Sequence, residues 1–218
     1  MNMAASRFSV IPRAVFAGIL IAIAGWGFLA NSVLGMFLFC VGLIAVVKYG
    51  AKLYTGTAGF LNGRGEVLPL VLILIGNIIG CLAVAAVSLY SPLALPEAAA
   101  PIVASRLKVG WIGTGLLAIG CGLLMSFSVD FARRNRDFSD WLPLLFAVPA
   151  FILCGFPHCV ADAFYCCVWL LSGILTDNPL SLPFQTSLLL PLTAYYVSIV
   201  IGNFLGCNLY RLFLREKA

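Results

Sequence analysis

Residues 155–165 read GFPHCVADAFY and interrupt a stretch of sequence that is otherwise almost entirely apolar. This segment holds His158, the one histidine in 218 residues, and an acid, Asp162, four positions later. A glycine and a proline precede the histidine, and both residue types disfavour the interior of a helix. The segment therefore predicts a helix that breaks inside an apolar span and places an ionisable side chain at the break.

The composition of the whole chain is that of an integral membrane protein. Hydrophobic residues make up 62% and charged residues 10%, whereas soluble domains average about 45–50% apolar and about 25% charged residues. Six apolar windows reach or exceed the roughly 20 residues that span a bilayer. They cover about residues 11–31, 34–60, 67–90, 107–130, 141–171 and 188–214. Because these windows fill the chain, we expect one transmembrane domain over residues 1–218.

The net charge of +5 is unevenly placed between the predicted spans. Most basic residues fall on one side if both termini share that side: Arg7, Arg13, Arg64, Arg133, Arg134, Arg136, Arg211, Arg215 and Lys217. The opposite side has Arg106 and Lys108. The positive-inside rule then predicts a multi-pass protein of the cell (inner) membrane with both termini cytoplasmic. The charges are thus a topology signal, and we expect no nucleic-acid partner.

The placement of the eight cysteines indicates a packing role and argues against disulfides or a metal site. All eight lie inside predicted spans, no pair has the C-x-x-C spacing, and there is a single histidine to join them. Cysteine packs well as a small hydrophobic residue. We therefore expect free thiols, and neither a metal site nor a cofactor.

Two of the windows are abnormally long and contain polar residues near their middle. Windows 34–60 and 141–171 have about 27 and about 31 residues, against the roughly 20 that suffice. Each window is followed by one that contains G-N-x-x-G, at residues 76–80 and 202–206. This pattern predicts two three-helix halves, about 11–90 and 107–214, each with a broken second helix. An odd helix number makes the halves inverted in the membrane, as in many channels and transporters.

Three motifs make the chain resemble the formate–nitrite transporter family of anion channels. Residues 155–162, GFPHCVAD, resemble the G-F-E-H-x-x-A-N signature of that family. Residues 50–56, GAKLYTG, resemble its G-A-[DE]-L-F-T-[GS] loop, and residues 118–125, AIGCGLLM, resemble its G-I-x-C-N-x-x-V segment. The resemblance covers nearly the whole chain. It implies an all-α polytopic membrane protein with six transmembrane helices in an aquaporin-like fold, assembled as a homopentamer with one pore per protomer.

The resemblance also implies a substrate and a set of pore residues. The substrate would be a small monovalent anion such as formate or nitrite, moved across the lipid bilayer with or without a proton. His158 would line the pore, in contact with Thr55. Two hydrophobic constrictions would be formed by Phe39, Leu43, Leu53, Tyr54 and Phe151. Arg106, or its neighbour Lys108, would stand where the family has a vestibule lysine.

The chain departs from the family pattern at four positions. Lys52 replaces an acid, Pro157 replaces the glutamate before the histidine, and asparagines are replaced by Asp162 and Gly122. Lys52 and Asp162 together suggest a compensated change, with a cation on one broken helix and an anion on the other. Asp162 has three candidate roles: to pair with Lys52, to hold the ring of His158, or to cap its half-helix.

An anion in a low-dielectric constriction faces a large energetic penalty. The start of each half-helix after a break offers free N–H groups and a positive dipole end. Lys52 or Lys48 can supply a full charge, and His158 can donate a hydrogen bond or a proton. A weak acid that gains a proton between hydrophobic rings then crosses uncharged.

Other classes of function explain the sequence less well. A membrane enzyme would use His158 with Cys159, but adjacent helical residues do not face each other, so we expect no enzyme. An aquaporin-like neutral-solute channel would suit the broken helices but lacks paired N-P-A loops. A purely structural subunit would not carry such costly ionisable residues inside its spans.

Overall fold

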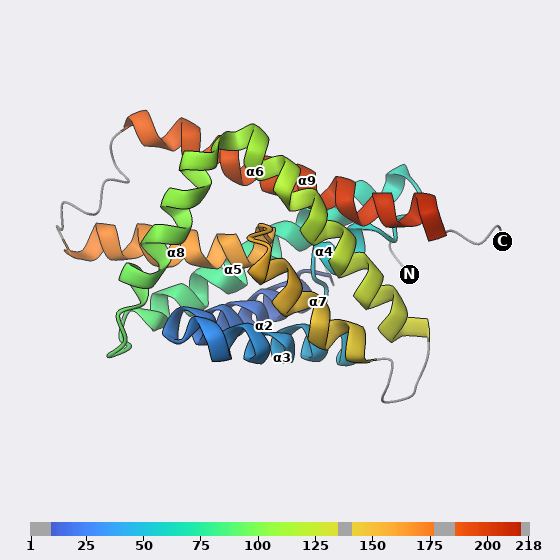
Figure 1. The fold of residues 1–218 in the computed structure, drawn as a ribbon, viewed down its shortest axis with the longest axis horizontal. Coiled ribbons are helices and arrows are strands. Elements are labelled where there is room, and N and C mark those ends of the chain that lie inside the picture. Colours follow the sequence, from blue (N-terminus) through green and yellow to red (C-terminus); the bar gives the residue numbers. More distant parts are fainter. Residues whose placement is uncertain (1–9, 135–140, 177–185, 215–218) are drawn as a thin grey trace.

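The computed structural model describes residues 10–134, 141–176 and 186–214, and the regular elements in these ranges are helices (Figure 1). In chain order they are α2 (Val10–Ala30), α3 (Ser32–Lys48), α4 (Thr55–Ala58), the 3-10 turn η1 (Arg64–Glu66), α5 (Val67–Ser88), α6 (Leu95–Arg134), α7 (Leu142–Leu153), α8 (Cys159–Thr176) and α9 (Thr186–Leu214). The predicted all-helical class is confirmed. Among the basic residues that indicated topology, Arg7, Arg136, Arg215 and Lys217 lie outside the described residues.

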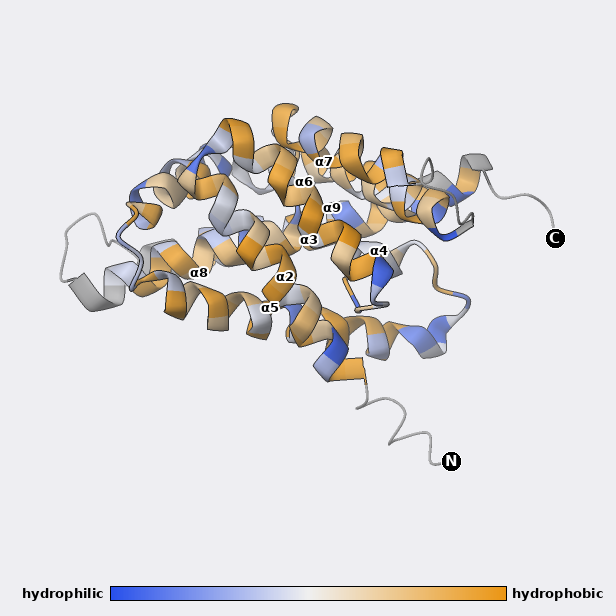
Figure 2. Ribbon diagram, turned by 90° about the horizontal axis from the view of Figure 1, so that it is seen from below, coloured by the Kyte–Doolittle hydropathy of each residue, from blue (hydrophilic) through white to orange (hydrophobic). Residues whose placement is uncertain are grey.

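Most residues of the helices are hydrophobic (Figure 2), and many large apolar side chains are exposed, as contact with a bilayer requires. Four described helical segments are long and apolar enough to cross a membrane: Val10–Ala30, Arg64–Ser88, Leu95–Arg133 and Leu190–Leu209. Three shorter apolar helices are Ser32–Lys48, Leu142–Leu153 and Cys159–Gly173. These shorter helices belong to the two windows in which the sequence predicted breaks. The chain is thus a multi-pass membrane protein, in which α2 begins and α9 ends toward the same end of the molecule (Figure 1).

Helix α3 stops at Lys48 through a glycine turn. Gly50 has φ 64°, the left-handed region that glycine adopts most readily. Ala51 N–H donates to Val46 O (2.9 Å) and Gly50 N–H donates to Val47 O (3.3 Å). This pair of bonds is the Schellman pattern that ends many helices. The chain then runs outside any helix until α4 begins at Thr55.

Helix α7 stops in the same way 105 residues later. Gly155 has φ 68°, Phe156 N–H donates to Phe151 O (2.9 Å), and Gly155 N–H donates to Ile152 O (3.0 Å). Helix α8 begins at Cys159. The glycine of GFPHCVADAFY therefore ends one helix, and its histidine immediately precedes the next.

The G-N-x-x-G motifs lie where two pairs of helices approach closely, α2 with α5 and α6 with α9. A Cβ atom added to Gly18 of α2 would lie 2.1 Å from the backbone oxygen of Asn77 in α5. A Cβ atom added to Gly122 of α6 would lie 2.2 Å from the backbone oxygen of Asn203 in α9. Gly122 stands where the family that the sequence resembles has asparagine, and this contact distance leaves no room for that side chain.

Helix α6 differs from the prediction. The apolar windows predicted a helix at about 107–130 and a connection before it, but α6 begins at Leu95. Its backbone leaves helical geometry at Gly110 (φ 77°, ψ 165°), so residues 95–109 form a separate helical segment. This segment carries Pro101 and charged residues, which hid it from a search for apolar windows. Thr114 Oγ1 donates to Arg106 O (3.1 Å) across the bend.

The cysteines are free thiols, as the sequence predicted. Most are buried between helices, while Cys154 is exposed and Cys167 is half-buried. Several thiols donate to backbone carbonyls, as Cys81 does to Val160 O (3.3 Å). Their role in this fold is packing.

Candidate functional site

His158 caps the start of α8 with its own ring. Ala161 N–H donates to His158 Nδ1 (3.2 Å), and Asp162 N–H donates to His158 O (2.8 Å) as the first bond of the helix. A side-chain acceptor that satisfies the N–H of the third helical residue is an N-cap. The imidazole is buried, and its bond to Ala161 N–H holds the ring against the helix that follows it.

This cap determines the tautomer of the ring. A backbone N–H can only donate, so His158 Nδ1 must accept, and in the neutral ring the proton is on Nε2. Nε2 lies 2.9 Å from Thr55 Oγ1 and therefore donates to it. A second proton on Nδ1 would break the cap and place a cation at the positive end of the α8 dipole. The geometry thus favours a neutral imidazole.

The His158–Thr55 bond joins the two interruptions of the fold. Thr55 is the first residue of α4, which follows the break after α3, and it is fully buried. His158 follows the break after α7. Because Thr55 Oγ1 accepts from His158 Nε2, the hydroxyl proton of Thr55 is left to donate elsewhere. The two residues are 103 positions apart, and the contact that the family resemblance implied for them is present.

An apolar wall surrounds this polar pair. The ring of Phe151 stacks on His158 with centroids 5.7 Å apart and an interplanar angle of 25°. Phe39 meets Phe151 edge-on, at 6.3 Å and 88°. The remaining predicted constriction residues, Leu43, Leu53 and Tyr54, are also buried. His158 therefore presents its N–H in surroundings of low polarity.

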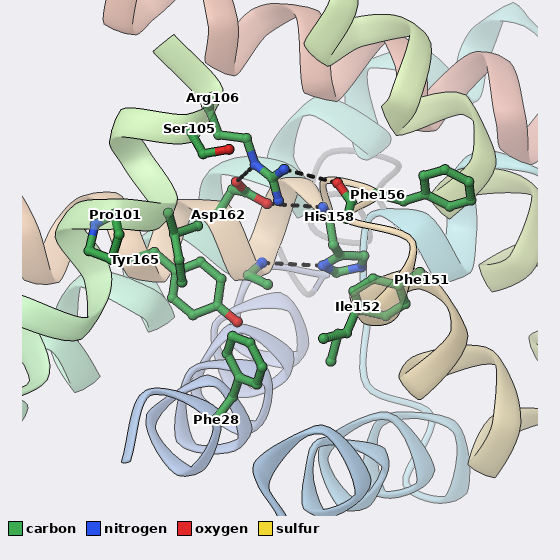
Figure 3. Close-up of a pocket in the computed structure, with 13 residues that line it drawn as sticks. Phe28, Pro101, Ser105, Arg106, Phe151, Ile152, Phe156, His158, Asp162 and Tyr165 are labelled. Atoms are coloured by element: carbon green, nitrogen blue, oxygen red, sulfur yellow. Dashed lines mark hydrogen bonds and ion pairs between the residues drawn. The ribbon is translucent and has the colours of Figure 1, made fainter. Parts of the chain in front are cut away.

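Asp162 is paired with Arg106 (Figure 3). Arg106 Nε donates to Asp162 Oδ1 (3.0 Å), and Arg106 Nη1 donates to Gly155 O (2.9 Å). The other carboxylate oxygen accepts from His158 N–H (3.0 Å). The predicted alternative of a Lys52–Asp162 pair is wrong, because Asp162 pairs with Arg106 instead. The ring of His158 is held by Ala161 and Thr55, so the capping role describes Asp162 best.

A cavity of about 290 Å³ lies beside this network, and we call it the His158 cavity (Figure 3). Its walls combine aromatic rings with the Arg106–Asp162 pair. Its lining residues are Phe28, Pro101, Ile102, Ser105, Arg106, Phe151, Ile152, Gly155, Phe156, His158, Ala161, Asp162 and Tyr165. Of the two predicted vestibule cations, Arg106 lines this cavity. Lys108 is exposed and is not part of the lining.

A second cavity, of about 390 Å³, borders the other break, and we call it the Lys52 cavity. Its polar wall includes Lys52, Thr57, Glu66 and Arg133. Arg133 Nη2 donates to Gly56 O (3.0 Å), just as Arg106 binds Gly155 O in the His158 cavity. The Lys52 cavity adjoins the residues directly after Thr55. The His158–Thr55 bond therefore lies between the elements that line the two cavities.

Lys48 lines neither of these two cavities. It is exposed, and its ammonium group lies 5.9 Å from the centroid of the Trp141 ring. This places it at a helix end, near an aromatic ring. Of the two lysines that were candidates for a pore charge, Lys52 is the one that borders a cavity.

Two asparagines hold the breaks together, a role that the sequence analysis missed. Asn203 Oδ1 accepts from Cys159 N–H (2.8 Å), and its Nδ2 donates to Ala118 O (2.8 Å) and Pro157 O (3.0 Å). Asn77 does the same in the other half: its Oδ1 accepts from Tyr54 N–H (2.9 Å), and its Nδ2 donates to Ala14 O and Lys52 O (2.8 Å each). Both side chains are fully buried. The sequence did contain a signal for this role, because Asn77 and Asn203 are polar residues near the middle of the apolar windows 67–90 and 188–214.

Comparisons with known proteins agree with this geometry. The sequence profile described as formate/nitrite transporter matches residues 2–214. A search of curated protein sequences finds no match. Among solved structures, a "Pentameric formate channel with formate bound" is similar at a TM-score of 0.80 and 20% identity, over 97% of each chain. An "FNT family ion channel" is similar at a TM-score of 0.74 and 18% identity, over 96% of this chain and 88% of that one. At such identities these two structures show the fold.

Proposed function

Because this chain belongs to the formate/nitrite transporter family, we propose that it is a membrane channel for small monovalent anions of weak acids, such as formate or nitrite. The family membership predicted from its motifs is confirmed. The observation that carries the proposal is the buried His158–Thr55 pair, which joins the two segments that line the His158 cavity and the Lys52 cavity. It offers a hydrogen-bond donor, the Thr55 hydroxyl, to a small oxygen-bearing solute in an otherwise apolar passage.

The transport step follows from the cost of burying charge. A bare anion beside Phe39 and Phe151 would lose its hydration shell without a counter-ion, and this is strongly unfavourable. Its conjugate acid is uncharged and meets a much smaller barrier. In this mechanism the anion gains a proton from the surrounding water before or as it reaches the passage. The Thr55 hydroxyl, whose oxygen accepts from His158 Nε2–H, then stabilises it by donating a hydrogen bond.

Basic residues on one side supply the anion to this passage. Lys52 and Arg133 border the Lys52 cavity, whereas Arg106 in the His158 cavity is paired with Asp162. Positive charge at the mouth of a narrow path raises the local concentration of anions. In the proposed cycle the anion gathers at a cavity and crosses the apolar segment as the acid. It dissociates again on the far side.

For the fold, we propose six crossings in two inverted halves of one domain, with aquaporin-like broken helices. The support is a set of matching contacts. Gly50 and Gly155 end helices in the same way, and Asn77 and Asn203 bind equivalent backbone groups. Pro157 marks a difference between the halves. Lys52 N–H donates to Arg13 O (3.1 Å), and proline has no N–H for the corresponding bond.

We propose a homopentamer in the inner membrane, with both termini in the cytoplasm. The similar solved formate channel is described as pentameric. The start of α2 and the end of α9 lie toward one end of the fold (Figure 1), as an even number of crossings requires. The measured mass of the detergent-solubilised protein tests the assembly, and a mass of a monomer or dimer would contradict it.

A flux assay tests the function. Purified full-length protein in liposomes is expected to carry formate and nitrite well above empty liposomes, and His158→Asn is expected to change that flux. Asparagine keeps a donor but cannot reproduce both the cap to Ala161 and the bond to Thr55. Wild-type flux equal to that of empty liposomes for every small monovalent anion would refute the proposal.

An aquaporin-like neutral-solute channel is the second candidate, because the His158 cavity is lined largely by apolar side chains. It predicts water or glycerol flux without flux of weak acids, and the same liposomes distinguish the two. An enzyme is disfavoured by the relatives, which are channels and transporters.

A further inference from the structure

The His158 cavity contains an anion of its own, the carboxylate of Asp162. The Asp162 side chain is 3% exposed and the Arg106 side chain 15%. One carboxylate oxygen accepts from Arg106 Nε and the other from the backbone N–H of His158, each at 3.0 Å. Both oxygens are therefore engaged within the cavity wall (Figure 3).

These two donors are the groups that would bind a substrate anion at this place. Guanidinium groups bind carboxylates through strong charge-assisted hydrogen bonds. Backbone N–H groups at the start of a helix attract anions in the same manner. Asp162 occupies both a guanidinium donor, Arg106 Nε, and a backbone donor, the N–H of His158. A free anion that enters the His158 cavity therefore meets a guanidinium that the protein has already neutralised.

The turn itself does not require an acid, because the other half of the fold builds it without one. The position 105 residues before Asp162 is Thr57, by the same offset that relates Gly50 to Gly155. Thr57 carries no charge, and its Oγ1 donates to Leu53 O (2.8 Å). The carboxylate at Asp162 therefore supplies charge beyond what the backbone geometry needs.

The charge balance of the two cavities differs as a result. The lining of the Lys52 cavity includes two cations, Lys52 and Arg133, and one acid, Glu66. The lining of the His158 cavity has one cation, Arg106, and one acid, Asp162. A buried ion pair is in general a weak source of stability, so folding gains little from it. The pair instead removes the positive charge that the His158 cavity would otherwise offer.

We propose that Asp162 is a specificity-determining residue that acts as a tethered competitor of the substrate anion. By neutralising Arg106 it makes the His158 cavity admit the uncharged weak acid and exclude anions that cannot be protonated. This inference rests on the proposed channel function and deepens it, since it assigns the form of the substrate that passes this cavity.

The test compares formate, a weak-acid anion, with nitrate, which stays charged at neutral pH. Full-length protein in liposomes is measured for both fluxes. Asp162→Asn keeps the shape of the side chain and leaves Arg106 unneutralised. We expect its nitrate permeability to rise by about tenfold or more, because a unit charge at close range in a low-dielectric site has an effect of that order. Formate flux shows that the variant is folded and open.

Two controls separate this effect from a general change in charge. Glu97→Gln removes an exposed acid from the same segment of α6 as Arg106 and is expected to leave nitrate permeability unchanged. The double variant Arg106→Gln/Asp162→Asn is again neutral and is expected to exclude nitrate as the wild type does. An equal rise in Glu97→Gln, or a rise that persists in the double variant, would overturn the proposal.

The outcomes also distinguish this inference from the proposed function. If wild-type protein carries no formate, the proposed function fails. If wild-type protein carries formate but Asp162→Asn excludes nitrate, the inference alone fails. If Asp162→Asn carries no formate, Asp162→Thr, which copies the equivalent Thr57, replaces it in the test. Loss of formate flux in both variants would show that transport needs the acid, and this too would overturn the inference.

Discussion

Asn203 is expected to be the most sensitive uncharged position in the second half of the fold. In Asn203→Ala, three backbone groups lose a partner: the N–H of Cys159 and the carbonyls of Ala118 and Pro157. A buried polar group without its partner costs about 1–3 kcal/mol. The carbonyl of Ala118 lies inside α6 and keeps its helical hydrogen bond, so its contribution to the loss is small. We expect the free energy of unfolding to fall by about 4 kcal/mol in total.

This loss is measurable as a thermal shift. For a chain of this size, about 4 kcal/mol corresponds to a decrease in Tm on the order of 10 °C. The assay is the melting of helical circular dichroism in detergent, on the assembled protein. The matched control is Asn208→Ala, five positions along the same helix. Its half-buried side chain donates to Phe204 O (2.8 Å) and Ala58 O (3.2 Å), and its loss is expected to cost about 1 kcal/mol.

The comparison between the two asparagines tests whether the break before α8 depends on Asn203. The equivalent variant Asn77→Ala is expected to lower Tm by a similar amount, because Asn77 makes the same three bonds in the other half. If Asn203→Ala melts at the wild-type temperature, or if Asn208→Ala falls as far, the assigned role of these asparagines is refuted.

Three further predictions concern the passage and the helix packing. Thr55→Val removes the acceptor of His158 Nε2–H and is expected to reduce formate flux. Thr55→Ser keeps the hydroxyl and is expected to retain the flux. Equal formate flux in the two variants would contradict a role for the hydroxyl. Gly122→Ala places a Cβ 2.2 Å from Asn203 O and is expected to lower the yield of folded protein. The control Gly27→Ala places its Cβ in open space and is expected to leave the yield of folded protein unchanged. Equal yields of the two variants would argue against tight packing of α6 on α9. Formate flux in liposomes is expected to rise as external pH falls, because more of the substrate is then uncharged; a flux independent of pH would contradict transport of the acid.

Much of the fold could be predicted because bilayer rules depend on composition and length. The apolar windows gave the class, and Gly50 and Gly155 marked the ends of α3 and α7. The helical segment at 95–109 could not be found in this way, since its charges and Pro101 lower its hydropathy. That segment carries Arg106, so the omission also concealed one wall of the His158 cavity.

The contact between His158 and Thr55 was expected, and so was a capping role for Asp162, but its pairing with Arg106 was not. The resemblance of the two motifs to those of the family implied a contact between His158 and Thr55, and these residues meet at 2.9 Å. The pairing of Asp162 depends on which helices border each cavity, and this is a property of tertiary structure that spacing along the chain does not contain. Two departures from the family pattern suggested Lys52 as the partner of Asp162, but the partner in the structure is Arg106.

The central claim is that a weak acid crosses uncharged past a neutral His158, and the ratio of protons to formate tests it most directly. Formate uptake and internal pH are recorded together in liposomes that contain the full-length protein, with membrane current measured in parallel. We predict one proton carried with each formate and no formate-dependent current. A sustained formate current without acidification of the interior would show that the bare anion crosses, and it would contradict the account.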